Sequence, residues 1–138
     1  MRAESGTLLY ILSLGTERAA VEFQVGEILG RPVQAVQGCY EGELEWSVLV
    51  PADEYYEHLP AFQEALSTAE QECVMYLDGQ RNAYLVRGLS DGDGREYDFR
   101  AGDYKFLGEL KSVELATLAS NKFPKSYTII GERLHYVR

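Results

Sequence analysis

The sequence has few of the residues that build metal sites or disulfide frameworks. Its 138 residues include two cysteines and two histidines, and these four lie far apart in the chain. Cys39 and Cys73 form no C-x-x-C motif, and neither His58 nor His135 belongs to a cluster with metal-ligand spacing. We therefore expect buried, reduced thiols and no metal site built by the protein.

Long apolar segments and several common enzyme motifs are also missing. The longest early apolar run, Leu8 to Leu14, is too short to span a bilayer and lacks the basic flank and cleavage site of an export signal. No G-x-S-x-G, Walker A or G-x-G-x-x-G motif occurs, so the usual hydrolase, phosphate-binding and dinucleotide-binding signatures are absent. We expect a cytoplasmic protein with no membrane partner.

Basic side chains are scarce in the first half of the chain. The net charge is −9, and residues 1–69 carry three basic and eleven acidic side chains, whereas residues 70–138 carry ten and eleven. Such a chain is poorly suited to bind nucleic acid or anionic lipid, since both require a basic face. The acidic excess fits a solvated face, a mimic of DNA, or carboxylates gathered for a cationic ligand.

What the sequence does contain is an alternation of strand and helix patterns. The predicted elements are a strand at 7–14, a helix at 17–29, strands at 33–40 and 44–50, a helix from the N-cap Asp53 to Ala69 with a kink or an irregular first turn before Pro60, strands at 73–77 and 83–89, a loop at 90–103, a short helix at 113–119, and strands at 126–130 and 134–137. The first six elements follow the ferredoxin-like βαββαβ order. We therefore expect a single α+β domain over residues 1–138, with a ferredoxin-like core and extra C-terminal strands.

Two stretches carry polar groups near the predicted sheet ends. The first, Gly38 to Ser47, gathers Tyr40 and three glutamates about a hairpin, and the second places Gln71 and Glu72 where a helix meets a strand. A charged hairpin tip and an acidic helix end are the structural explanation of these residues. A binding or catalytic site is the functional one.

In their order along the chain, these stretches resemble the phage-encoded enzymes that degrade S-adenosylmethionine (SAM), first called SAM hydrolases and now SAM lyases. The resemblance is carried by Gly38-Cys-Tyr40, by Glu45 at the start of an alternating strand, by Gln71-Glu-Cys-Val74, and by Ala83-Tyr-Leu-Val86. It continues in Ser126-Tyr-Thr-Ile129 and Arg133-Leu-His-Tyr-Val137. The first 37 residues match only as a strand followed by a helix.

The resemblance implies cleavage of SAM to 5′-methylthioadenosine and homoserine lactone without a cofactor or metal. It also implies a PII-like homotrimer with active sites between subunits, and a role in depleting the host's methyl donor against restriction-modification systems. Tyr40, Glu45 and Gln71 correspond to the family's functional positions, and Glu43, Glu72 and Ser47 are further candidates for substrate binding. The connection from Tyr40 to Glu45 is shorter than in the family, so Glu41 or Glu43 could take the role given to Glu45.

Some alternatives remain open at this stage. The protein could bind and sequester a nucleotide-type ligand without reacting with it, or act as an acidic decoy for a DNA-binding protein. The aromatic side chains that could stack on adenine are Tyr10, Phe23, Trp46 and Tyr55, each of which could equally be a core residue.

Overall fold

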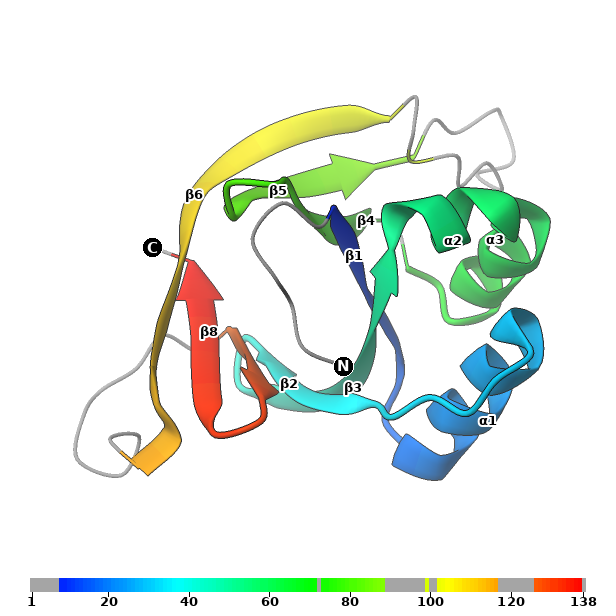
Figure 1. Cartoon of the computed structure of the whole chain (residues 1–138), viewed down its shortest axis with the longest axis horizontal. Helices are drawn as coiled ribbons and strands as arrows, with labels where there is room; N and C mark the ends of the chain where they lie inside the picture. The colour runs from blue at the N-terminus through cyan, green and yellow to red at the C-terminus, as the bar shows by residue number, and fades with distance from the viewer. Residues whose placement is uncertain (1–7, 72, 89–98, 100–101, 117–125, 138) are drawn as a thin grey trace.

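The chain folds into a closed β-barrel flanked on one side by helices (Figure 1). The computed structural model describes residues 8–71, 73–88, 99, 102–116 and 126–137. Around the barrel the strand order is β1-β3-β2-β7-β8-β6-β5-β4, and every ladder is antiparallel. The described strands are β1 (Leu9–Gly15), β2 (Val36–Tyr40), β3 (Glu43–Pro51), β4 (Cys73–Leu77), β5 (Asn82–Arg87), β6 (Asp103–Glu114), β7 (Tyr127–Ile130) and β8 (Arg133–Val137).

Three hairpins are set by turns that require left-handed backbone. Between β2 and β3, Tyr40 pairs with Glu43, and the two turn residues Glu41 and Gly42 have φ of 52° and 88°. Two positive φ values in a two-residue turn match the right-handed twist of the flanking strands. Arg81 in the β4–β5 turn and Gly131 in the β7–β8 turn also have positive φ. All three hairpins confirm the sequence prediction at these positions.

Side chains alternate along β1 between two hydrophobic cores, because successive strand residues point to opposite faces. Tyr10, Leu12 and Leu14 face outward and pack beneath the helices, in the larger core. Leu9 and Ile11 face into the barrel and pack there against Leu77, Ala83 and neighbouring apolar side chains. The interior cluster fills part of the barrel and leaves the remainder open.

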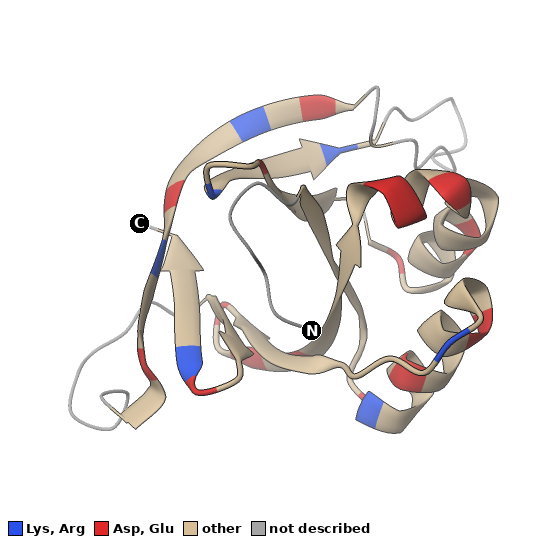
Figure 2. Cartoon of the chain, in the orientation of Figure 1, with Lys and Arg blue, Asp and Glu red and all other residues tan. Residues whose placement is uncertain are grey.

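The helices lie on the outer face of the β1–β3–β4 wall (Figure 1). They are α1 (Arg18–Leu29), α2 (Ala52–Glu57) and α3 (Leu59–Thr68). The break at His58, followed by Pro60 in the first turn of α3, is the irregularity expected at that proline. Acidic side chains lie on all three helices (Figure 2), so much of the negative charge of the first half faces away from the barrel interior. No helix in the described residues is long and apolar enough to cross a membrane.

The ferredoxin-like α+β core predicted from the sequence is wrong. Such a fold ends in an open sheet, whereas here β5, β6, β8 and β7 join the two edges β4 and β2 into a closed barrel. Closure depends on β6, a strand of 12 residues that pairs with β5 on one side and β8 on the other. The predicted helix at 113–119 is contradicted at its start, since Val113 and Glu114 belong to β6, whereas residues 115–116 form a 3₁₀ turn. Most of the predicted loop at 90–103 lies outside the described residues.

Candidate functional site

The open part of the barrel interior forms a cavity of about 500 Å³. That volume lies within the range of pockets that hold small organic ligands. Its wall is mostly apolar, with polar groups at a few positions. The lining residues are Ile11, Ser13, Cys39, Tyr40, Glu45, Gln71, Cys73, Val74, Met75, Leu85, Leu107, Leu110, Ser126, Tyr127, Thr128, Ile130, His135, Tyr136 and Val137.

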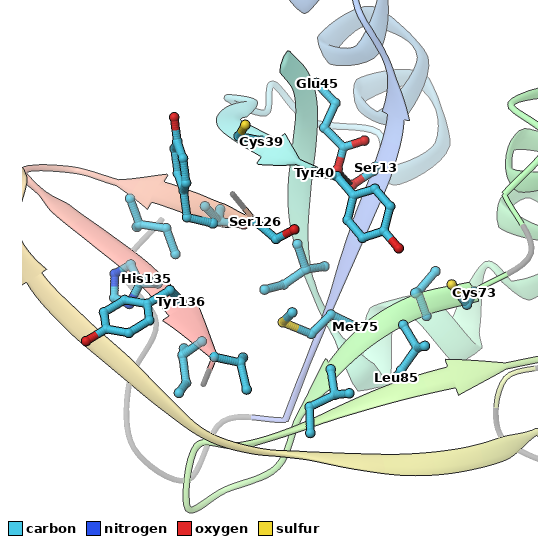
Figure 3. Close-up of a pocket in the computed structure, with 18 of the residues that line it drawn as sticks. Ser13, Cys39, Tyr40, Glu45, Cys73, Met75, Leu85, Ser126, His135 and Tyr136 are labelled. Carbon is cyan, nitrogen blue, oxygen red and sulfur yellow. Dashed lines mark hydrogen bonds between the residues drawn. The ribbon is translucent and has the colours of Figure 1, made fainter. Parts of the chain in front are cut away.

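Three residues singled out from the sequence, Tyr40, Glu45 and Gln71, all line this cavity. Tyr40 ends β2 and is 59% exposed, so it stands at the rim. Glu45 comes from β3, and Gln71 from the junction between α3 and β4. Figure 3 shows Tyr40, Ser13 and Glu45 together on one side of the cavity.

Glu45 is held by a short chain of hydroxyl groups. Its Oε1 accepts a hydrogen bond of 2.8 Å from Ser13 Oγ, and Ser13 Oγ lies 2.9 Å from Ser47 Oγ. Ser13 and Ser47 are paired in register on β1 and β3, and Ser47 is 1% exposed. The hydrogen bond from Ser13 therefore orients the Glu45 carboxylate at the cavity wall and leaves it further acceptor positions.

Gln71 is positioned by the end of α3. Glu70 adopts left-handed backbone with φ of 57°, the Glu70 N–H bonds to the Ser67 carbonyl, and the Gln71 N–H bonds to the Leu66 carbonyl. These two bonds form a Schellman-type helix ending, which reverses the chain direction. A glutamate at the left-handed position is less favourable than glycine. The local backbone thus brings Gln71 to the cavity wall.

The other predicted site residues take different positions. Glu43 is exposed and lies opposite Tyr40 outside the lining, and Glu41 occupies the hairpin turn. Ser47 contacts Ser13 and does not itself line the cavity. Glu72 lies outside the described residues. Of Glu41, Glu43 and Glu45, only Glu45 lines the cavity.

The four aromatic residues considered for adenine stacking do not line the cavity. Tyr10 and Tyr55 are fully buried in the outer core, with ring centroids 4.6 Å apart. Phe23 is 71% exposed on α1. The guanidinium carbon of Arg18 lies over the Trp46 ring, 5.2 Å from its centroid. Burial and hydrogen bonds from Tyr104 and Tyr56 raise the pKa of Tyr10 above its ordinary value, as expected for a core hydroxyl.

Sequence reasoning missed Ser13 and His135, which also line the cavity. Ser13 was detectable as the polar interruption of an otherwise apolar strand, whereas His135 lies in a strand whose pattern gives no sign of a cavity. Burial, followed by the positive charges of Arg133 and Arg81, lowers the pKa of His135. The imidazole is therefore neutral near pH 7.

The charge of the cavity suits a cationic ligand. Among the described lining residues Glu45 is the one carboxylate, and none is Lys or Arg. Cys39 and Cys73, expected to be buried, are reduced thiols that are partly exposed at the wall. Burial and the adjacent Cys39 raise the pKa of Tyr127. The described residues contain no group of three or more His, Cys, Asp or Glu side chains arranged to hold a metal.

Comparison with known proteins identifies the class of enzyme. The model of the S-adenosylmethionine lyase family matches residues 16–138, which is most of the chain. No curated protein sequence matches the chain significantly. The family match confirms the resemblance drawn from the residues around Tyr40, Glu45 and Gln71. The chain belongs to the S-adenosylmethionine lyase family and is an S-adenosylmethionine lyase.

Proposed function

We propose that the protein cleaves SAM to 5′-methylthioadenosine and homoserine lactone inside the barrel. The observation that carries this proposal is the convergence of Tyr40, Glu45 and Gln71 on one mostly apolar cavity of about 500 Å³. SAM carries a sulfonium, an ammonium and a carboxylate, for a net charge of one positive unit near neutral pH. The single described carboxylate in the lining complements that charge.

The reaction needs no external nucleophile. A carboxylate oxygen of SAM attacks its own Cγ, the bond from Cγ to sulfur breaks, and its electron pair leaves on sulfur to give a neutral thioether. No proton is transferred in this step, so neither a general base nor a catalytic triad is required. Holding the folded substrate conformer can contribute on the order of 7–11 kcal/mol, as in other well-oriented intramolecular reactions.

The apolar wall favours the transition state. The attacking carboxylate and the sulfonium lose their charges as the lactone forms, so water that stabilises these charges in the ground state slows the reaction. The side chains of Ile11, Met75 and Leu85 exclude water from part of the cavity. An aliphatic environment around the sulfonium therefore promotes cleavage.

Each polar residue then has a separate role in this proposal. Glu45, oriented by Ser13, binds the substrate's ammonium, whose charge does not change during the reaction, and so directs the adjoining carboxylate. The Tyr40 hydroxyl at the rim positions the methionine part. The Gln71 amide forms a hydrogen bond to the substrate. Direct contact of Glu45 with the sulfonium would instead stabilise the ground state.

We also propose that the active protein is a homotrimer, as the sequence resemblance implies. Leu44 and Phe106 are large apolar side chains that are 50% and 58% exposed, and Tyr40 is 59% exposed at the cavity rim. A neighbouring subunit packed on the β2–β3 hairpin would cover Tyr40 and reduce solvent entry. Light scattering on the purified protein tests this, and a monomer of 15.5 kDa that retains full activity would contradict it.

The biological role is proposed from the same resemblance. Cleavage of SAM in the cytoplasm of a phage-infected cell would remove the methyl donor and cofactor on which restriction-modification systems depend. Cells that express the protein should show lower SAM and less methylation of plasmid DNA. Cells that express the Glu45→Gln variant should show smaller changes in both SAM and methylation.

The test of the reaction is product analysis with purified protein. After incubation with SAM, chromatography should show methylthioadenosine increasing as SAM disappears. A protein that only sequesters its ligand would retain intact SAM, and an acidic decoy would leave SAM free in solution. Either of these outcomes would contradict the proposed function.

A further inference from the structure

The barrel places His135 on the same inner face as Glu45, but on a different part of the wall. Glu45 pairs with Gly38, Gly38 with Thr128, and Thr128 with His135, across β3, β2, β7 and β8. Directly paired residues project to the same face of a sheet. With about 4.8 Å between neighbouring strands, His135 is about 14 Å from Glu45 along the curved wall. Figure 3 shows the two residues on different sides of the cavity.

The surroundings of His135 differ from those of Glu45. Leu110 and Val137 are paired with each other, Val137 lies two residues beyond His135 on β8, and all three line the cavity. Ile130 also lines the cavity and lies two residues beyond Thr128 on β7. His135 itself is paired with Ser112 and Thr128, and its neutral imidazole offers one hydrogen-bond donor and one acceptor beside the aliphatic side chains.

The two ends of SAM differ in charge, as do the two parts of the cavity wall. The methionine end carries all three charged groups, whereas adenine is flat and uncharged, with an amino donor adjoining ring-nitrogen acceptors. If Glu45 binds the ammonium, the adenine must extend away from the charged wall. A flat heterocycle buried among aliphatic side chains needs a hydrogen-bonding partner for its polar edge.

We propose that His135 recognises the adenine of SAM, with one imidazole nitrogen accepting a hydrogen bond from the amino group of the base. Leu110, Ile130 and Val137 contact the base around it. This inference rests on the proposed function, because it assigns the second end of the same substrate. It makes His135 a residue that determines specificity for the base and has no part in breaking the bond to sulfur.

Calorimetric titration with two nucleosides that lack the amino-acid part tests the proposal. Methylthioadenosine carries the adenine amino group, and methylthioinosine replaces that group with a keto oxygen. The wild-type protein should bind methylthioadenosine about tenfold more tightly. His135→Leu, which has a similar volume and no hydrogen bond, should weaken methylthioadenosine binding about tenfold and reduce the preference to within twofold.

Two further variants provide comparisons. His58→Leu changes the other histidine, between α2 and α3 and outside the cavity, and should leave both nucleoside affinities unchanged. His135→Gln keeps a donor and an acceptor and should retain part of the base preference. This second variant, checked by circular dichroism, separates loss of recognition from loss of folding.

The titrations can contradict the adenine site without reference to catalysis. Equal affinity of the wild type for the two nucleosides would overturn the proposal, as would a preference that survives in folded His135→Leu. A protein that prefers methylthioadenosine through His135 but leaves SAM intact would support the adenine site and contradict the proposed reaction. The two claims therefore fail separately.

Discussion

Replacing Glu45 by glutamine removes the charge that the structure aims into the cavity while keeping nearly the same shape. The glutamine side-chain oxygen can still accept the hydrogen bond from Ser13 Oγ, which is 2.8 Å long in the wild type. The Ser13–Ser47 contact beneath it is likewise retained. The variant should therefore fold normally and differ mainly in how it binds the substrate ammonium.

The expected loss follows from the strength of a hydrogen bond between charged groups. Such bonds contribute about 1.5–3 kcal/mol, so kcat/KM for SAM should fall by roughly tenfold to a hundredfold. Because the ammonium keeps its charge throughout the reaction, most of the loss should appear as a higher KM. A smaller fall in kcat is expected from the less well directed carboxylate.

Steady-state measurement of methylthioadenosine release is the assay, with two comparison variants. Glu57→Gln removes an exposed carboxylate on α2, far from the lining residues, and should leave kcat/KM unchanged. Glu41→Gln tests the other carboxylate of the hairpin, which lies in the turn outside the lining. Unchanged kinetics in Glu45→Gln, or a larger loss in Glu41→Gln, would refute the role given to Glu45.

Three further predictions concern the cavity, the helix end and pH. A Cβ at Gly38 would lie 3.5 Å from Ser47 Oγ, which is ordinary contact, so the Gly38→Ala variant should stay active. The larger side chain of Gly38→Val should lower kcat/KM at least tenfold with an unchanged circular dichroism spectrum. Full activity in Gly38→Val would contradict the cavity assignment. Glu70→Gly should raise the free energy of unfolding, measured by urea titration, by up to about 1 kcal/mol, because glycine adopts the left-handed backbone without steric cost. A destabilised Glu70→Gly variant would contradict the strain assigned to this helix end. The pKa of His135 is lower in the folded protein than its ordinary value of 6.5, so the unfolded chain binds the proton more readily and the free energy of unfolding should fall as pH drops below about 6.5. The His135→Gln variant should show a shallower fall between pH 7 and 5. An identical slope in the variant and the wild type would contradict the burial of a neutral imidazole.

Local features of the fold were predictable from the sequence, and closure of the barrel was not. The hairpin at Glu41-Gly42 and the break near Pro60 follow from turn and proline chemistry within a few residues. Strand β6 escaped prediction because the alternation of polar and aromatic residues from Asp103 to Phe106 is broken at Gly108, where the pairing with β5 is irregular. Its pairings with β5 and β8 depend on contacts between distant segments, which local patterns do not encode.

The candidate site was predictable where its residues cluster in the chain. The resemblance to the family singled out Tyr40, Glu45 and Gln71 among the polar groups near strand ends, and all three line the cavity. His135 lies alone in a strand, and only the barrel register brings it to the same inner face as Glu45. The adenine candidates Tyr10 and Tyr55 proved to be core residues because the outer face of β1 is covered by helices.

The most direct test of the central claim is SAM cleavage in ¹⁸O-labelled water, followed by mass spectrometry of the early products. Intramolecular attack predicts methylthioadenosine together with unlabelled homoserine lactone, since both lactone oxygens come from the SAM carboxylate. Later opening of the lactone at its carbonyl would label the carboxylate and leave the hydroxyl oxygen on Cγ unlabelled. Homoserine formed from the outset with ¹⁸O in its hydroxyl group would show that water attacks Cγ, and would contradict the account.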